Sequence, residues 1–112
     1  MEESSYSNFE KLNIRTGTIV SAEIFAEARN PAYKLQIDFG SEIGVLKSSA
    51  QITARYQPED LLGRQIVAVV NFPRKQIGKF MSECLVLGAA GENGDVILLQ
   101  PERRTKNGQR VL

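Results

Sequence analysis

The chain has 112 residues, of which 42% are apolar and 24% are charged, and its formal net charge is +1. This length suits one compact domain with a single hydrophobic core. The small net charge excludes a molecule-wide positive field, so any surface for nucleic acid must come from local clusters of cations. The sequence has no histidine and one cysteine, which excludes Ser-His and Cys-His catalytic pairs, histidine-based zinc sites and an intrachain disulfide. We therefore expect a non-enzymatic protein with no cofactor.

The first eleven residues, MEESSYSNFEK, are polar and acidic and lack the apolar segment of a signal peptide. No stretch of the chain approaches the ~18 consecutive apolar residues of a membrane span. These observations predict a cytoplasmic protein without membrane insertion. We expect one domain at residues 8–112, preceded by a polar tail at residues 1–7.

The first elements are a short helix and a long strand. Ser7 and Glu10 have the spacing of a capping box, which predicts a helix over residues 8–12. Residues 13–25 are rich in Thr, Ile and Val and contain Gly17, which predicts a long strand with a bulge or bend at the glycine.

The middle of the chain carries the clearest strand pattern. Four apolar residues alternate with polar ones over residues 33–39, which indicates a strand with one buried face. A turn at residues 40–42 leads to a second strand at 43–49, and Pro58 and Gly63 have the places of a helix start and stop. Strands are also expected at residues 64–72, 84–89 and 96–99. Together these elements predict an all-β fold, an OB-type five-stranded Greek-key barrel with short flanking helices.

Cations cluster in two segments that lack acidic residues. Residues 64–80 carry Arg64, Arg74, Lys75 and Lys79, and the last three lie around turn residues, which is typical of a loop that holds a polyanion against a sheet. The alternative is a solvated loop. Residues 103–112 carry four more cations, either on a mobile tail or at a dimer interface, because apolar residues near both termini need a partner surface.

Several spaced motifs carry a family resemblance. They are NIRTGTI at 13–19, KLQIDFG at 34–40, NFPRK at 71–75, MSECLVL at 81–87 and LQP at 99–101, with Gly108 beyond them. These segments resemble the tRNA-binding OB domain that is appended to methionyl- and phenylalanyl-tRNA synthetases and that also occurs as stand-alone proteins.

Within this family, KSSAQIT at 47–53, with RY at 55–56 and PE at 58–59, resembles the CsaA-type chaperones related to protein secretion. Residues 26–35, AEARNPAYKL, depart from the His-Pro and Ala-Asp pattern of the synthetase-type members. The resemblance implies a homodimer that binds unfolded preproteins. The absence of a GxxxxGK[ST] loop predicts that this activity needs no ATP. The alternative is a stand-alone module that binds tRNA or other RNA without sequence preference.

The candidate residues for peptide or RNA binding are cations, short polar side chains and one aromatic. Arg15 is either a phosphate contact or part of a strand-end ion pair, and the two serines after Lys47 either bind a ligand or cap a turn. Phe72 offers a stacking face if it is exposed, and Tyr56 and Phe80 are each either similar or part of the core. The full predicted set is Arg15, Lys47, Ser48, Ser49, Gln51, Asn71, Phe72, Arg74, Lys75, Lys79 and Ser82.

Overall fold

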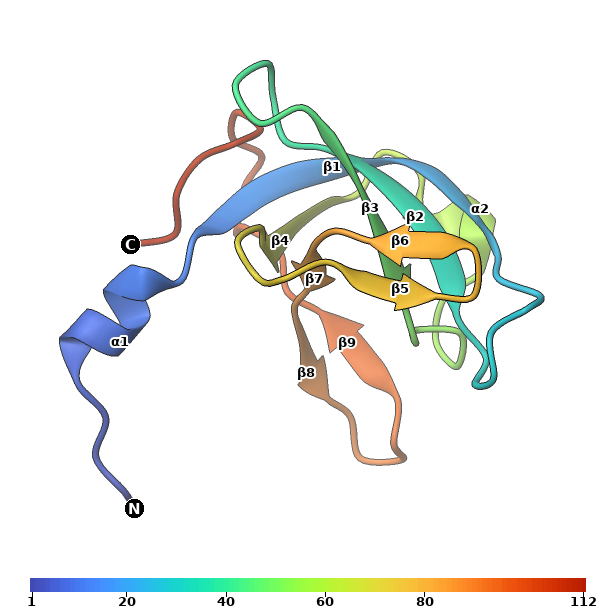
Figure 1. Cartoon of the computed structure of the whole chain (residues 1–112), viewed down its shortest axis with the longest axis horizontal. Coiled ribbons are helices and arrows are strands. Elements are labelled where there is room, and N and C mark those ends of the chain that lie inside the picture. Colours follow the sequence, from blue (N-terminus) through green and yellow to red (C-terminus); the bar gives the residue numbers. More distant parts are fainter.

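The structure, a computed structural model, describes residues 1–112 and contains a curled antiparallel sheet that forms a nearly closed barrel (Figure 1). The strand order is β3-β2-β1-β4-β7, so β4 returns to lie beside β1 in the Greek-key manner. The strands are β1 (Ile14–Ile24), β2 (Tyr33–Asp38), β3 (Val45–Ala50), β4 (Gln65–Val69) and β7 (Leu85–Val86). The predicted OB-type barrel is confirmed.

The remaining elements are two short helices and two hairpins. They are α1 (Tyr6–Lys11), α2 (Pro58–Leu61), β5 (Lys75–Ile77) with β6 (Phe80–Ser82), and β8 (Gly88–Ala90) with β9 (Val96–Leu98). In Figure 1 the β5–β6 hairpin crosses in front of β2 and β3, and the β8–β9 hairpin extends away from the barrel. Neither helix has the length and apolar composition needed to cross a bilayer.

The alternation at residues 33–39 fills the barrel as predicted. Tyr33, Leu35, Ile37 and Phe39 are all buried, and the core continues through β1, β4 and α2. Each strand can bury one face because its side chains alternate between the two sides of the sheet.

Gly17 has a different role from the one expected. The irregularity in β1 lies between Ile19 and Ser21, so the predicted bulge at Gly17 is wrong. A Cβ atom at Gly17 would lie 2.7 Å from side-chain atoms of both Ile37 and Phe39. The glycine therefore lets two core side chains pack directly against the backbone of β1.

The predicted capping box at Ser7 and Glu10 is also wrong. Helix α1 begins at Tyr6 after Ser5, no side chain caps it, and none of its residues is buried. Its carboxyl end is anchored instead, because the Asn71 amide donates to Lys11 O at 2.8 Å. The second helix, α2, lies where Pro58 predicted it.

The predicted strand boundaries need three corrections. The strand expected at 64–72 ends at Val69, and the one expected at 84–89 is divided into β7 and β8. The basic segment expected to be a loop forms the β5–β6 hairpin, in which Gly78 has a positive φ of 60° at the turn.

Residues 101–111, which we call the C-terminal strap, lie against β1 and β4 and are not a mobile tail. The Thr16 hydroxyl donates to Lys106 O at 2.9 Å. The Gln65 side chain donates to Thr105 O at 2.8 Å and accepts from Thr105 N at 3.0 Å. These bonds fix the backbone that carries the strap's four cations relative to the barrel.

Candidate functional site

A groove of about 420 Å³ opens between the end of β3, the β5–β6 hairpin and β7. We call it the β3–β5–β7 groove. Its apolar lining comes from Ala50, Ile52, Phe72, Pro73, Ile77, Cys84, Leu85, Val86 and Val96. Its polar lining comes from Ser49, Gln51, Lys75, Ser82 and Glu83. The groove thus combines a mostly apolar surface with a few hydrogen-bonding groups, which is the usual composition of a binding site.

Two side chains and one backbone hydrogen bond, rather than a paired strand, join the hairpin to the edge of β3. Glu83 N donates to Lys47 O at 2.7 Å, and Lys47 N donates back to the Glu83 carboxylate at 2.9 Å. Ser49 N donates to the Ser82 hydroxyl at 3.0 Å. These contacts satisfy backbone groups on β3 and hold one wall of the groove in place. Glu83 thus ties the segment after β6 to a backbone amide of β3.

The cations of the hairpin are only partly available. The Arg74 guanidinium lies 3.6 Å from the Glu83 carboxylate, and the Lys47 ammonium lies 5.4 Å from the centre of the Phe80 ring. Lys75 and Lys79 are exposed, and neither forms an ion pair. Two free lysines therefore remain of the basic cluster that the sequence suggested.

Five of the eleven predicted residues line the groove: Ser49, Gln51, Phe72, Lys75 and Ser82. Phe72 is 42% exposed, so its ring is accessible. Lys47, Arg74 and Lys79 belong to the strand and hairpin that form the wall, but they do not line the hollow itself.

The other three predicted residues have structural contacts. The Ser48 side chain is buried and donates to Cys84 O at 2.9 Å. Asn71 accepts from Asn13 N at 2.8 Å and donates to α1. Arg15 donates to Gly108 O at 2.9 Å and forms no ion pair, so the reading of Arg15 as a strand-end ion pair is wrong.

Most of the apolar lining could not be recognised in the sequence. Leu85 and Val86 stood out only as strand residues, and Ala50, Ile77 and Val96 come from segments far apart in the chain. Tyr56 is a core residue, because it is buried and its hydroxyl accepts from Leu98 N at 3.0 Å. Burial, reinforced by the Glu83 carboxylate, raises the pKa of the Cys84 thiol to about 12, so this thiol is neutral.

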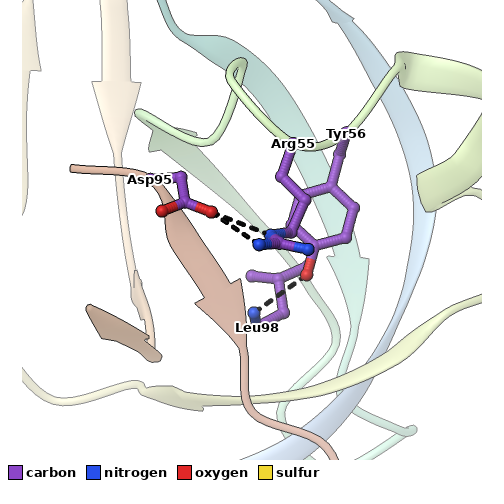
Figure 2. Close-up of polar contacts among 4 residues, drawn as sticks. All are labelled: Arg55, Tyr56, Asp95 and Leu98. Carbon is purple, nitrogen blue, oxygen red and sulfur yellow. Dashed lines mark hydrogen bonds and ion pairs between the residues drawn. The ribbon is translucent and has the colours of Figure 1, made fainter. Parts of the chain in front are cut away.

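A second set of contacts attaches the β8–β9 hairpin to the segment after β3 (Figure 2). The Arg55 guanidinium donates two hydrogen bonds to Asp95 Oδ2, at 3.0 and 2.7 Å. The adjacent Tyr56 hydroxyl accepts from Leu98 N, as Figure 2 shows. Val96, which lines the groove, lies between these two attachment points on β9.

The family described as "Putative tRNA binding domain" matches residues 14–110, which is nearly the whole chain. The chain belongs to this family. It is 32% identical over 111 residues to the methionine–tRNA ligase of Methanocaldococcus jannaschii and 35% identical over 104 residues to that of Methanococcoides burtonii. These matches cover 99% and 93% of this chain but only 17% and 15% of the ligases.

Solved structures of similar length also match. The chaperone CsaA of Bacillus anthracis str. Ames has a TM-score of 0.93 and 54% identity, over 99% of this chain and 100% of that chain. The CsaA chaperone protein of Picrophilus torridus has a TM-score of 0.93 and 47% identity, over 98% and 100%. The predicted family relationships, to the synthetase domain and to the CsaA-type proteins, are confirmed.

Proposed function

We propose that this chain binds extended segments of unfolded polypeptides, including preproteins, in the β3–β5–β7 groove without ATP. The observation that carries the proposal is the exposed apolar rim. Phe72 and Leu85 are 42% and 47% exposed beside a mostly apolar hollow. The similarity to two solved CsaA chaperones supports the same function. In this proposal the protein is a non-catalytic, cytoplasmic, export-related chaperone.

An extended peptide has backbone partners as well as apolar contacts. Strand β5 pairs only with β6, so its other edge, at Lys75–Ile77, has no strand beside it. Ser49, Gln51 and Ser82 place short polar side chains within the same groove. A peptide can therefore add to the free edge of β5 while alternate side chains enter the hollow.

Aggregation of a chemically unfolded substrate tests this function. Wild-type protein at a stoichiometric ratio suppresses light scattering without nucleotide, because holding a chain requires exposed apolar surface only. Phe72→Ser and Leu85→Ser lose most of the suppression. Leu62→Ser is the matched control, because Leu62 is 56% exposed and does not line the groove. No suppression by wild type, or suppression that requires nucleotide, contradicts the proposal.

We also propose that the active form is a homodimer. Helix α1 has six residues and buries none of them, and an isolated helix of this length is unstable in water. Tyr6, Ile97 and Leu112 leave further apolar surface uncovered. A second copy would cover these groups, giving a mass by light scattering of twice the 12.4 kDa of one chain. A monomer mass at micromolar concentration contradicts this state.

RNA binding is the second candidate function. The family match covers residues 14–110 and is defined by a tRNA-binding domain. Phosphate contacts would come from unpaired cations, which release counterions from the RNA when they bind. Weak, sequence-independent tRNA binding with a steep salt dependence is the expected result.

A further inference from the structure

The outer part of the β8–β9 hairpin, residues 88–97, is attached to the barrel by one polar contact (Figure 2). The Arg55 guanidinium donates to Asp95 Oδ2 through Nε at 3.0 Å and through Nη2 at 2.7 Å. Apart from bonds within the hairpin, residues 88–97 make no other hydrogen bond. Strand β8 consists of exposed glycine and alanine, so it offers no large side chain to the barrel. The Arg55–Asp95 contact, which we call the latch, is therefore the one polar restraint on this part of the hairpin.

The latch joins two walls of the β3–β5–β7 groove. Ile52 lines the groove from the segment after β3, and Arg55 lies three residues farther along that segment. Val96 lines the groove from β9, directly after Asp95, and packs on the edge of the barrel core. The latch therefore fixes the position of one wall relative to the other.

The inner end of β9 is attached more firmly than the outer end. Leu98 is buried, and its N–H donates to the Tyr56 hydroxyl at 3.0 Å within the core. The Arg55 side chain is 48% exposed, so water competes with Asp95 for its donors. Val96 lies between these two attachments, so its position depends on the weaker one.

A glycine leaves room for the latch. A Cβ atom at Gly91 would collide with the Asp95 carboxylate, which lies against the glycine backbone. The Gly91 N–H donates to Asp95 O at 2.8 Å, and this backbone pairing needs no side chain. An added methyl group would turn the carboxylate away from Arg55 and leave the pairing intact, because the Asp95 side chain can move to another rotamer.

We propose that Arg55 and Asp95 are positioning residues for peptide binding, because the latch holds Val96 where the groove wall contacts an apolar side chain of the peptide. This inference rests on the proposed peptide-binding function and identifies residues outside the groove on which that function depends. A wall that is ordered before the peptide arrives does not have to be ordered by it, so the cost of ordering does not reduce the affinity.

The binding of a fluorescein-labelled peptide in which leucines alternate with serines, measured by anisotropy, tests the role of the latch. Arg55→Ala removes both donors, and we expect the affinity for the peptide to fall by about three- to tenfold, chiefly through faster dissociation. Arg103→Ala is the matched control. Arg103 also donates two hydrogen bonds to one carboxylate, that of Glu102, and it does not line the groove. This control should bind the peptide as wild type does.

Gly91→Ala opens the latch without changing either of its residues, and it serves as the test if Arg55→Ala does not fold. It should weaken peptide binding by the same factor as Arg55→Ala. Thermal unfolding gives the melting temperature of each variant, and binding is measured well below the lowest of them. A variant that is only less stable then binds normally, because nearly all of its molecules are folded.

A double-mutant cycle with Val96 separates positioning from other effects of the variants. Val96→Ala removes the part of the wall that the latch holds in this proposal. If the latch acts through Val96, Arg55→Ala with Val96→Ala binds the peptide no more than about twofold more weakly than the weaker-binding single variant. If Arg55 affects binding independently of Val96, the two losses multiply.

Three results overturn the inference. Wild-type affinity in Gly91→Ala shows that the latch does not position the groove wall, while binding by wild type leaves the proposed function intact. Losses that multiply in the double variant show that Arg55 does not act through Val96. If wild type does not bind the peptide, the proposed function and the role of the latch are both wrong.

Discussion

Lys47 and Glu83 close a ring of two hydrogen bonds that joins β3 to the segment after β6. Each residue's backbone N–H takes part, one donating to the Glu83 carboxylate at 2.9 Å and the other to Lys47 O at 2.7 Å. The Glu83 carboxylate accepts a backbone hydrogen bond from β3 that a neighbouring strand would otherwise accept. This contact holds β6 against the barrel although β6 is not part of the main sheet.

Replacing Glu83 tests whether this ring holds the groove wall. Glu83→Ala leaves Lys47 N without its acceptor, and we expect it to lower the free energy of unfolding by about 1–3 kcal/mol. Arg74→Ala removes only an ion pair of a side chain that is 66% exposed, so it should cost less than about 1 kcal/mol. Urea unfolding measures both. Equal values for the two variants would show that the ring does not stabilise the fold.

Gly17 offers a test of the packing in the barrel. Gly17→Ala places a methyl group 2.7 Å from atoms of Ile37 and Phe39, and such overpacking typically costs about 1–3 kcal/mol. Val20→Ala, on the same strand at a residue that is 50% exposed, should change stability by less than about 0.5 kcal/mol. The melting temperature reports the difference. A Gly17→Ala protein as stable as wild type would mean that the barrel relaxes around the extra methyl group.

The sequence predicted those elements that are determined by residues within or next to them. The alternation at residues 33–39 identified β2 because buried apolar residues alternate with polar ones along a single strand. Pro58 and Gly63 likewise marked α2, because helix ends depend on the nearest residues. The β5–β6 hairpin was not predicted because its strands have three residues each, which is too short to show an alternating pattern.

Long-range contacts could not be predicted from a single sequence. The strap is attached through Thr16 to a residue 90 positions away, so the cations of residues 103–110 had the appearance of a free tail. Ala50 and Val96 meet in the groove although no local pattern relates them. The charge of Arg15 is visible in the sequence, but the position of its side chain depends on Gly108, which only the folded chain brings near.

The Arg55–Asp95 pair predicts a specific dependence of stability on pH. Hydrogen bonds from the Arg55 guanidinium hold the pKa of the Asp95 carboxyl below its ordinary value of 3.8. Because the pKa is lower in the folded state, the carboxylate contributes stability above the unfolded pKa, and this contribution is lost as pH falls through the folded pKa. Asp95→Asn should therefore be less stable than wild type at neutral pH, and the difference should shrink below about pH 4.

Unfolding in urea at several pH values between about 2 and 7 tests this dependence. Glu102→Gln is the control, because Glu102 is 77% exposed and pairs only with its neighbour Arg103. That variant should follow the wild-type curve at every pH. If the difference in the free energy of unfolding between Asp95→Asn and wild type is constant over the whole pH range, ionisation of the Asp95 carboxyl does not cause it.

The Cys84 thiol reports opening of the groove wall. Burial raises its pKa to about 12, so almost no thiolate is present at pH 8, and the side chain is only 7% exposed. A disulfide reagent should modify the native protein far more slowly than it modifies an exposed thiol. Gln36→Cys in a Cys84→Ser background supplies that exposed reference, because Gln36 is exposed on β2.

Two kinds of opening could expose the Cys84 thiol to the reagent: local lifting of the hairpin from β3, or unfolding of the whole protein. A pair of variants distinguishes them. Cys84 lies immediately before β7 in the chain and lines the groove. Its neighbour Glu83 holds the hairpin to β3. If lifting of the hairpin from β3 exposes the thiol, Glu83→Ala should accelerate labelling by more than its loss of global stability explains. Arg74→Ala is the control and should not show this excess acceleration. A bound peptide should slow the reaction further by covering the groove. Labelling of native Cys84 as fast as the Gln36→Cys reference would show that the thiol is neither buried nor protected, and would contradict this description of the groove wall.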